Sequence, residues 1–399
     1  MDNNLKPKLR FRTFTEDWKP KRLRDIGDTY GGLTGKSKED FGHGDAQFVT
    51  YMNVYTNPVA SPNGVDHVEV DSTQNEVKKG DILFTTSSET PDEVGMSSVW
   101  LGDTPNTYLN SFCFGYRPKI EIDPYFSAYL MRSPRIRESF YLLAQGISRF
   151  NISKNKAMEI EASMPGIDEQ VMIGSLFTHL VESISIKQQE LEKLENVKKA
   201  CMERMFPREG KTTPQLRIKG FTDEWNQVML GDICKVTMGQ SPDGVTYSDT
   251  PSDYILVQGN ADLKDKRVFP RIWTTQITKT ADKGDIIMSV RAPVGSIGMT
   301  DYDVVIGRGV AAIKGNDYIY YYLERLEILG HWSTVSKGST FDSINSNDLI
   351  KLNIKIPNIS EQEKIGNYFR HLDELIAAKR QEIEKLQNIK QSLLDKMFV

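Results

Sequence analysis

Short loops in both halves of this chain carry side chains that could read the edges of nucleic-acid bases. In the first half, hydroxyl groups and a carboxylate follow one another in the segment Thr85-Thr86-Ser87-Ser88-Glu89. The matching segment of the second half contains Arg291. An arginine can pair with guanine, whereas hydroxyl and carboxyl groups can pair with other base edges. Matched loops with different donors and acceptors are expected if each half of the chain reads a different short sequence.

A second loop in each half begins near a glycine and carries further polar groups. It reads QGISRFN at residues 145–151 and KGSTFD at residues 337–342. The loops and the residues just after them give a set that we predict to contact DNA. These are Thr85, Thr86, Ser87, Ser88, Glu89, Ser148, Arg149, Asn151, Lys154, Arg291, Lys337, Ser339, Thr340 and Ser343.

Local positive charge favours this interpretation, although the whole chain has a formal net charge of −4 at pH 7. Basic residues outnumber acidic ones in residues 1–24 and again in residues 132–156. Such a local excess is the footprint expected for contacts with phosphate groups. Either stretch alone would also fit an ordinary solvated surface. The basic residues concerned are Lys6, Lys8, Arg10, Arg12, Lys19, Lys21, Arg22, Arg24, Arg132, Arg135, Arg137, Arg149, Lys154 and Lys156.

Motifs for catalysis are missing from the sequence. It has no GxxxxGK[ST] phosphate loop and no glycine-rich fingerprint for a dinucleotide or a methyl-donor cofactor. Asp71, Glu76 and Lys78 could form a nuclease-type cluster, but the second half does not repeat it, and we interpret it as a charged strand edge. The three cysteines are scattered without metal-ligand spacing. We therefore expect no catalytic residue and no metal site.

The loops belong to two copies of one unit, at about residues 1–206 and 207–399. The phrase FTEDW of Phe14–Trp18 returns as FTDEW at Phe221–Trp225, and KGDI of Lys79–Ile82 returns at Lys283–Ile286. The offset between the copies drifts through the first part of each copy and is constant through the last part. A period of this length predicts a duplicated domain pair rather than a solenoid of short repeats.

The last part of each copy predicts a long helix. Apolar residues alternate at spacings of four and three, which is a heptad seam whose simplest partner is the seam of the other copy. Lys187 and Lys379 interrupt it at one matched position, and either set its register or mark a solvated kink. Asp168 and Ser360 are the predicted N-caps. The predicted packing residues are Ile173, Phe177, Leu180, Ile184, Leu191, Leu194, Ile365, Phe369, Leu372, Ile376, Ile383 and Leu386.

The first part of each copy predicts a mixed α/β head, in which the KGDI phrase is a turn entering a strand. Helical stretches are predicted at Tyr125–Ala144 and Asp317–Leu329, and Trp18 and Trp225 are predicted to be packing residues. The predicted strands are Gln47–Val54, Ile82–Thr86, Phe112–Tyr116, Tyr254–Gln258, Ile286–Val290 and Val304–Ile306.

The resulting fold class is α+β, with two mixed α/β domains that are each followed by a long helix. The predicted boundaries are 1–160, 161–206, 207–352 and 353–399. No apolar run is long enough to span a membrane, so we expect a cytoplasmic protein without a membrane partner.

The order of these motifs, repeated twice, resembles the specificity subunit of a Type I restriction–modification system. The resemblance covers essentially all 399 residues. It is carried by the KGDI strand entry, the QG or KG loop, and the helix entry IP-x-I-x-EQ-x-x-I at Ile356–Ile365. The first copy departs from this helix entry with Met164 in place of isoleucine.

The resemblance implies two target-recognition domains, each reading one half of a bipartite, asymmetric site in double-stranded DNA. It further implies that the helices pack as an antiparallel coiled coil, set the gap between the half-sites and dock two modification subunits. S-adenosylmethionine would be bound by those partners, and ATP and Mg by restriction subunits that carry the motor and the nuclease. The chain itself would be non-catalytic and hold no cofactor.

Two other classes of protein stay open. The first is an enzyme with a disguised methyltransferase or nuclease site, which predicts methyl transfer or cleavage by the purified chain alone. The second is a coiled-coil scaffold that does not bind DNA, which predicts no salt-dependent affinity for DNA in any complex.

Overall fold

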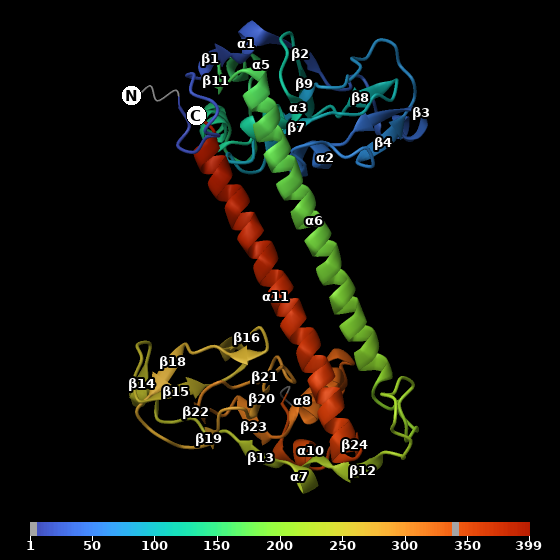
Figure 1. The fold of residues 1–399 in the computed structure, drawn as a ribbon, viewed down its shortest axis with the longest axis vertical. Helices are drawn as coiled ribbons and strands as arrows, with labels where there is room; N and C mark the ends of the chain where they lie inside the picture. The colour runs from blue at the N-terminus through green and yellow to red at the C-terminus, as the bar shows by residue number, and fades with distance from the viewer. Residues whose placement is uncertain (1–5, 337–342) are drawn as a thin grey trace. The chain divides into compact units, whose positions relative to one another are not determined.

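The structure is a computed structural model of the chain, and it describes residues 6–336 and 343–399. It separates into two compact units. Unit 1 comprises residues 1–188 and 381–399, and unit 2 comprises residues 189–380. The long helices α6 (Ile167–Arg204) and α11 (Ile359–Met397), green and red in Figure 1, each contribute to both units. The four domain boundaries predicted from the sequence stay a prediction, because the division into two compact units does not test where each head ends and its helix begins.

The head of unit 1 is built on two small sheets. Within the described chain, the first has the strand order β2-β9-β5-β7 and the second the order β4-β3-β8. Strand β1 pairs with β11, and β6 pairs with β10. The strands are β1 (Lys19–Arg22), β2 (Gly27–Gly31), β3 (Phe41–Val49), β4 (Val65–Val68), β5 (Ile82–Thr85), β6 (Ser87–Ser88), β7 (Ser97–Val99), β8 (Thr107–Leu109), β9 (Cys113–Pro118), β10 (Phe150–Asn151) and β11 (Glu161–Met164). The short helices are α1 (Leu23–Ile26), α2 (Tyr51–Thr56), α3 (Pro124–Leu130), α4 (Pro134–Leu143) and α5 (Lys154–Ala157), with a 3-10 turn at Lys38–Asp40.

The head of unit 2 is also built on two sheets, and each has more strands than its counterpart in unit 1. Its strand orders among the described residues are β13-β23-β20-β21-β17-β16 and β14-β18-β15-β22-β19, and β12 pairs with β24. The strands are β12 (Asn226–Met229), β13 (Lys235–Met238), β14 (Tyr247–Ser248), β15 (Tyr254–Val257), β16 (Leu263–Lys264), β17 (Arg267–Val268), β18 (Ile272–Thr274), β19 (Thr280–Ala281), β20 (Ile286–Ser289), β21 (Ile297–Met299), β22 (Val304–Ile306), β23 (Val310–Lys314) and β24 (Asn353–Ile356). The short helices are α7 (Leu230–Ile233), α8 (Asp317–Ile328), α9 (His331–Ser336) and α10 (Ser346–Ile350), with 3-10 turns at Gly244–Thr246 and Asn260–Asp262.

The repeated KGDI phrase is a turn entering a strand, as predicted. Gly80 and Gly284 have φ angles of +90° and +92°, which glycine adopts without a steric cost. The side chain of the aspartate that follows accepts a hydrogen bond from the backbone N–H three residues earlier. Asp81 accepts from Lys78, and Asp285 accepts from Asp282. The motif therefore recurs because it sets the entry of the strands β5 and β20.

The Glu-Gln pair of each helix entry fastens the helix to its own head. Gln170 donates to the carbonyl of Pro165 and accepts from the N–H of Asp123 at the start of α3. In unit 2, Gln362 donates to Pro357 and accepts from Asn316 at the start of α8. The glutamate before each glutamine is buried and forms a two-bond pair with an arginine, Arg10 with Glu169 and Arg217 with Glu361.

A glycine lets each long helix approach its head closely. A Cβ atom added at Gly174 would lie 2.4 Å from a carboxylate oxygen of Asp123. At Gly366 it would lie 2.7 Å from the Cβ atom of Asp317. Both separations are shorter than non-bonded contacts allow, so this position of the repeat requires glycine.

Within each unit the two long helices run antiparallel and contact one another. In unit 1, Phe398 near the end of α11 packs on Phe177 near the start of α6, at 5.7 Å between ring centroids. In unit 2, Phe206 just beyond α6 stacks on Phe369 of α11 at 5.8 Å. Trp18 and Trp225 are buried beside these rings, as expected for packing residues. A continuous coiled coil along the whole length of both helices stays a prediction.

The seam positions show graded burial. Ile173, Phe177, Ile184, Ile365, Phe369, Leu372, Ile376 and Ile383 are buried, and Leu180, Leu191, Leu194 and Leu386 are half-buried. Lys187 donates to Glu382 within unit 1, and Lys379 donates to Glu190 within unit 2. These two lysines therefore pair across the helices, which favours the register-setting alternative over a solvated kink.

Four local predictions are wrong. The predicted strand Gln47–Val54 ends at Val49, because Thr50 caps helix α2 by accepting from the N–H of Asn53. The predicted helix Tyr125–Ala144 is two helices, because Pro134 begins a new one after Ser133. Helix α11 begins at Ile359, where Asn358 rather than Ser360 is the cap and accepts from the N–H of Glu361. Helix α6 likewise begins at Ile167, before the predicted cap Asp168.

Across the residues described, no helix has an apolar stretch long enough to cross a lipid bilayer.

Candidate nucleic-acid interface

The two candidate loops of unit 1, which lie far apart in the sequence, are joined by backbone pairing. Ser87 and Ser88 form strand β6, which pairs with Phe150 and Asn151 in β10. The N–H of Ile152 also donates to the carbonyl of Thr86 at 3.0 Å. The loop after the KGDI strand and the loop that begins near Gly146 therefore form one surface of unit 1.

Unit 2 repeats this junction with different side chains. Arg291 pairs with Ser343 in an antiparallel bridge, and the N–H of Ile344 donates to the carbonyl of Val290 at 2.9 Å. The hydroxyl of Ser289 donates to the carbonyls of Arg291 and Pro293, which shapes the loop between β20 and β21. Three predicted residues of this surface, Lys337, Ser339 and Thr340, lie outside the described part of the chain.

The predicted contact residues of unit 1 differ in their exposure. Thr85, Ser87 and Ser88 are buried, and Thr86 is half-buried. Because buried hydroxyls cannot reach a base edge in this conformation, the sequence prediction is revised for Thr85, Ser87 and Ser88. The exposed members of the predicted set are Glu89, Ser148, Arg149, Asn151 and Lys154 in unit 1 and Arg291 in unit 2, and Ser343 is half-buried.

A network of side chains supports the loop of residues 86–96 in unit 1. The hydroxyl of Tyr51 donates to the carbonyl of Ser87, and Ser88 donates to the carboxylate of Glu93 at 2.8 Å. A hydrogen bond to Glu93 raises the pKa of Tyr55 to about 12 and lowers the pKa of Glu93. The support comes mainly from helix α2, where the sequence had predicted a strand.

Two arginines of the basic stretch have an internal role. Arg137 donates to the carbonyls of Asp92, Val94 and Gly95, at 2.7 Å each. Arg132 donates to the carbonyls of Ser97, Val54, Tyr55, Asn57 and Thr56. Burial lowers the pKa of both guanidinium groups to about 10. The prediction that this stretch contacts phosphate is wrong for these two, because their donors are used inside unit 1.

The basic stretch of residues 1–24 is also partly neutralised within unit 1. Arg10 pairs with Glu169, Arg22 with Glu161, Arg24 with Glu159 and Lys6 with Asp17. In the described chain, Lys8, Arg12, Lys19 and Lys21 form no such pair. The charge available for phosphate contact at this end is therefore smaller than the sequence predicts.

We expect Arg137→Met to loosen the loop of residues 86–96. The substitution leaves three carbonyls without their donor, which costs about 1–3 kcal/mol when such groups are buried. Hydrogen exchange of the amides of residues 86–96 should show local opening that is easier by about that amount. Arg135→Met is the matched control, since Arg135 is on the same helix but exposed. Equal exchange in the two variants would contradict the anchoring role.

The two carboxylates of the candidate nuclease cluster accept hydrogen bonds from neighbouring residues. The carboxylate of Asp71 accepts from Lys36, Thr73 and Gln74, and the hydrogen bond from Lys36 is the main cause that lowers its pKa. The carboxylate of Glu76 accepts from the N–H of Asn106. Asp71 lies in the loop after β4 and not on a strand edge, so that interpretation is corrected. Its hydrogen bonds hold this loop together. Among the described residues, no group of three histidine, cysteine or acidic side chains could hold a metal ion.

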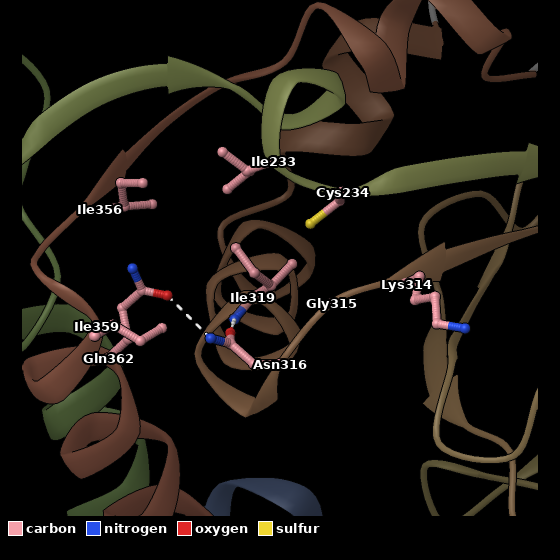
Figure 2. Close-up of a pocket in the computed structure, with 9 residues that line it drawn as sticks. All are labelled: Ile233, Cys234, Lys314, Gly315, Asn316, Ile319, Ile356, Ile359 and Gln362. Carbon is pink, nitrogen blue, oxygen red and sulfur yellow. Dashed lines mark hydrogen bonds between the residues drawn. The ribbon is translucent and has the colours of Figure 1, made fainter.

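Two pockets adjoin the starts of the long helices, one in each unit. One pocket of about 340 Å³ in unit 2 is lined mainly by aliphatic side chains, with the Asn316–Gln362 hydrogen bond at its edge (Figure 2). A second pocket in unit 1 is lined by residues of the FTEDW phrase and of the α6 entry, including Arg10 and Glu169. Both pockets adjoin side chains that fasten a helix to a head, so they are parts of that support.

Some residues that support or form the candidate interface were not apparent from the sequence. Tyr51, Tyr55 and Arg137 hold the loop only because the tertiary fold brings α2 and α4 to it. Phe112 was predicted only as part of a strand, yet its side chain is 53% exposed beside Arg149, whose guanidinium carbon lies 5.3 Å from the ring centroid. Burial patterns in the sequence could not identify it, because phenylalanine is ordinarily a core residue.

Comparison with known proteins gives a consistent result. The family model described as Type I restriction modification DNA specificity domain matches residues 15–196 and 222–388. A putative type I restriction enzyme MjaX specificity subunit of Methanocaldococcus jannaschii is 28% identical, over 95% of this chain and 92% of the relative.

Two solved structures have a similar fold. The Type-I restriction-modification system S subunit of M. genitalium matches with a TM-score of 0.64 and 16% identity, over 99% of both chains. A chain from a study of complex assembly and conformational transition of the type I R-M system matches with a TM-score of 0.60 and 24% identity, over 95% of this chain and 97% of the other.

Proposed function

Because the chain belongs to the family of Type I restriction modification DNA specificity domains, of which it contains two, we propose that it is the DNA-reading subunit of such a system. Each head reads one half of a bipartite, asymmetric target in double-stranded DNA. The exposed loop residues contact base edges, and basic side chains contact phosphates.

The observation that carries this proposal is the repeated junction of the two candidate loops. The same backbone connections recur in both units, at Thr86 with Ile152 and at Val290 with Ile344. The exposed side chains on the junctions differ, however, with Arg149 and Asn151 in unit 1 and Arg291 in unit 2. A common framework with different surface donors is what two readers of different sequences require.

The long helices act as the spacer and as a docking site in this proposal. Helix α6 has 38 residues and helix α11 has 39, so each is about 57–58 Å long at 1.5 Å per residue. Two modification subunits and the restriction subunits would assemble on the chain. S-adenosylmethionine would be bound by the modification subunits, and ATP and Mg by the restriction subunits. The chain itself would catalyse no reaction.

Methylome sequencing of cells with and without the gene tests the proposal. We expect a bipartite methyl-adenine motif that disappears when the gene is deleted. An identical methylome in both strains would contradict the proposal. Methyl transfer or cleavage by the purified chain alone would instead support an enzyme.

We expect Arg291→Ala to weaken binding through the half-site read by unit 2. Arg291 is exposed and makes no ion pair among the residues described, so its guanidinium can pair with a base. Loss of one base contact costs about 1–3 kcal/mol. Competition binding on single-base variants of the target should show relaxed specificity at one position. Arg267→Ala is the control, because Arg267 is exposed but paired with Asp301. Equal weakening on target and random DNA would rule out base reading by Arg291.

A further inference from the structure

We propose that the hairpin of residues 145–151 in unit 1 reads a guanine, with Arg149 stacked on Phe112 and paired to the base in the major groove. This inference rests on the proposed function and names the base chemistry of one half-site. The guanine contact would be made by an arginine–aromatic pair that the backbone holds in place.

The hairpin has a defined backbone. Gln145 and Asn151 exchange both backbone hydrogen bonds, at 3.0 and 2.8 Å. Gly146 between them has a φ angle of +149°, and a Cβ atom there would lie 2.0 Å from the carbonyl oxygen of Arg149. The tight approach therefore requires glycine and fixes where the arginine leaves the backbone.

Phe112 is held to the same surface by a separate set of bonds. Its carbonyl accepts from the N–H of Thr86 at 2.8 Å, and its N–H donates to the side chain of Asn110 at 2.9 Å. Thr86 also accepts from Ile152 just beyond the hairpin. Thr86 thus joins the backbone of Phe112 to the hairpin, so that the point from which the ring extends is set beside Arg149, although the residue is 53% exposed.

Among the described residues, Arg149 has its donors unused although it lies in the same basic stretch as two arginines whose donors are taken. Its guanidinium lies over the ring of Phe112 and makes no ion pair or side-chain hydrogen bond within the described chain. Arg132 and Arg137, in contrast, use their donors on backbone carbonyls. Stacking on a ring leaves the N–H groups at the edge of the guanidinium plane able to form the fork that matches O6 and N7 of guanine. A guanidinium already held in place loses less freedom on binding.

The surroundings of the pair also suit a groove of DNA. Ile147 at the tip of the hairpin is 97% exposed, and Leu142 before the hairpin is 75% exposed. Covering such aliphatic surface against DNA removes it from water, which is favourable.

The test uses the full chain assembled with its modification subunits and duplexes that carry the mapped target. Each guanine is replaced in turn by 7-deazaguanine, which lacks the N7 acceptor. We expect the wild-type complex to lose about tenfold in affinity at one guanine. Arg149→Ala should bind the unmodified target about tenfold to a hundredfold more weakly and no longer respond to the replacement. Arg149→Lys, which keeps the charge but not the planar fork, should show a smaller response than the wild type, because an ammonium group can still donate to N7 but without the geometry of the fork.

Phe112→Leu and Arg22→Ala complete the comparison. Phe112→Leu keeps an apolar side chain but removes the platform, so it should reduce the response to 7-deazaguanine. Arg22→Ala should preserve the response, because Arg22 is exposed but paired with Glu161. Equal weakening of Arg149→Ala on target and random duplexes, or a wild-type complex insensitive at every guanine, would overturn the inference alone. A wild-type complex that prefers no sequence would overturn the proposed function as well.

Discussion

Replacing Glu361 by alanine is expected to destabilise unit 2 by about 3–5 kcal/mol, the usual cost of removing one partner of a buried ion pair. Glu361 is 0% exposed and receives two hydrogen bonds from Arg217, both at 2.8 Å. Without the carboxylate, the guanidinium of Arg217 keeps its charge at a site that is mostly shielded from water. The pair also joins the segment before the head to the start of α11, so its loss affects both elements.

Denaturant unfolding measures the loss of stability. Because the two units need not unfold together, hydrogen exchange is needed to assign that loss to unit 2. Glu363→Ala is the matched control, because Glu363 is exposed on the same turn of α11. The double variant Arg217→Met, Glu361→Leu should recover part of the loss, since it leaves no unpaired buried charge. A loss for Glu361→Ala no greater than for Glu363→Ala would contradict the anchoring role.

Lengthening both long helices by one heptad is expected to change the gap between half-sites while both half-site sequences stay the same. Seven residues add about 10 Å to a helix, the length of about three base pairs of B-DNA. The insertions belong after Gln188 and after Arg380, the matched positions where the two units divide. On the original target only one half-site could then be engaged. The loss should be on the order of half the specific binding free energy, about 2–5 kcal/mol.

Selection of the preferred target from a library with variable gaps measures the new spacing, which we expect to be longer by about one to three base pairs. An insertion after Leu194 in α6 alone is the comparison. It would displace Glu195 from Arg380 and the end of α6 from the unit 2 core, so it should destabilise the chain rather than reset the gap cleanly. Unchanged spacing in the double insertion would refute the role of the helices as a ruler.

Local sequence patterns predicted the long helices and the repeated motifs well. The heptad spacing predicted both long helices because periodicity is a property of consecutive residues. The recurrence of KGDI and of Glu-Gln was visible as repeated text, and each motif performs the same structural task in both units. Errors arose where one residue overrode a pattern, as when Thr50 capped a helix inside an apparent strand and Pro134 began a second helix.

The candidate interface was less predictable, because it depends on contacts between distant residues. Ser87 and Ser88 looked like exposed donors in the sequence, yet pairing with β10 buries them. Arg132 and Arg137 looked like phosphate contacts, yet backbone carbonyls of other segments accept hydrogen bonds from them. Whether a polar side chain is available to a partner depends on which segments fold against it, and that information is not local.

The sequence by itself therefore determined the duplication, the family resemblance and the long helices, since each rests on order and spacing along the chain. Only the tertiary structure decided which loops share a surface, which cations keep their donors available and which glutamate holds each head to its helix. The physical reason is that burial and hydrogen bonding depend on residues separated by many positions, such as Thr86 and Ile152 or Arg217 and Glu361. Arg149 and Arg137 lie twelve positions apart in one basic stretch, and only the fold separates an exposed donor from an internal anchor.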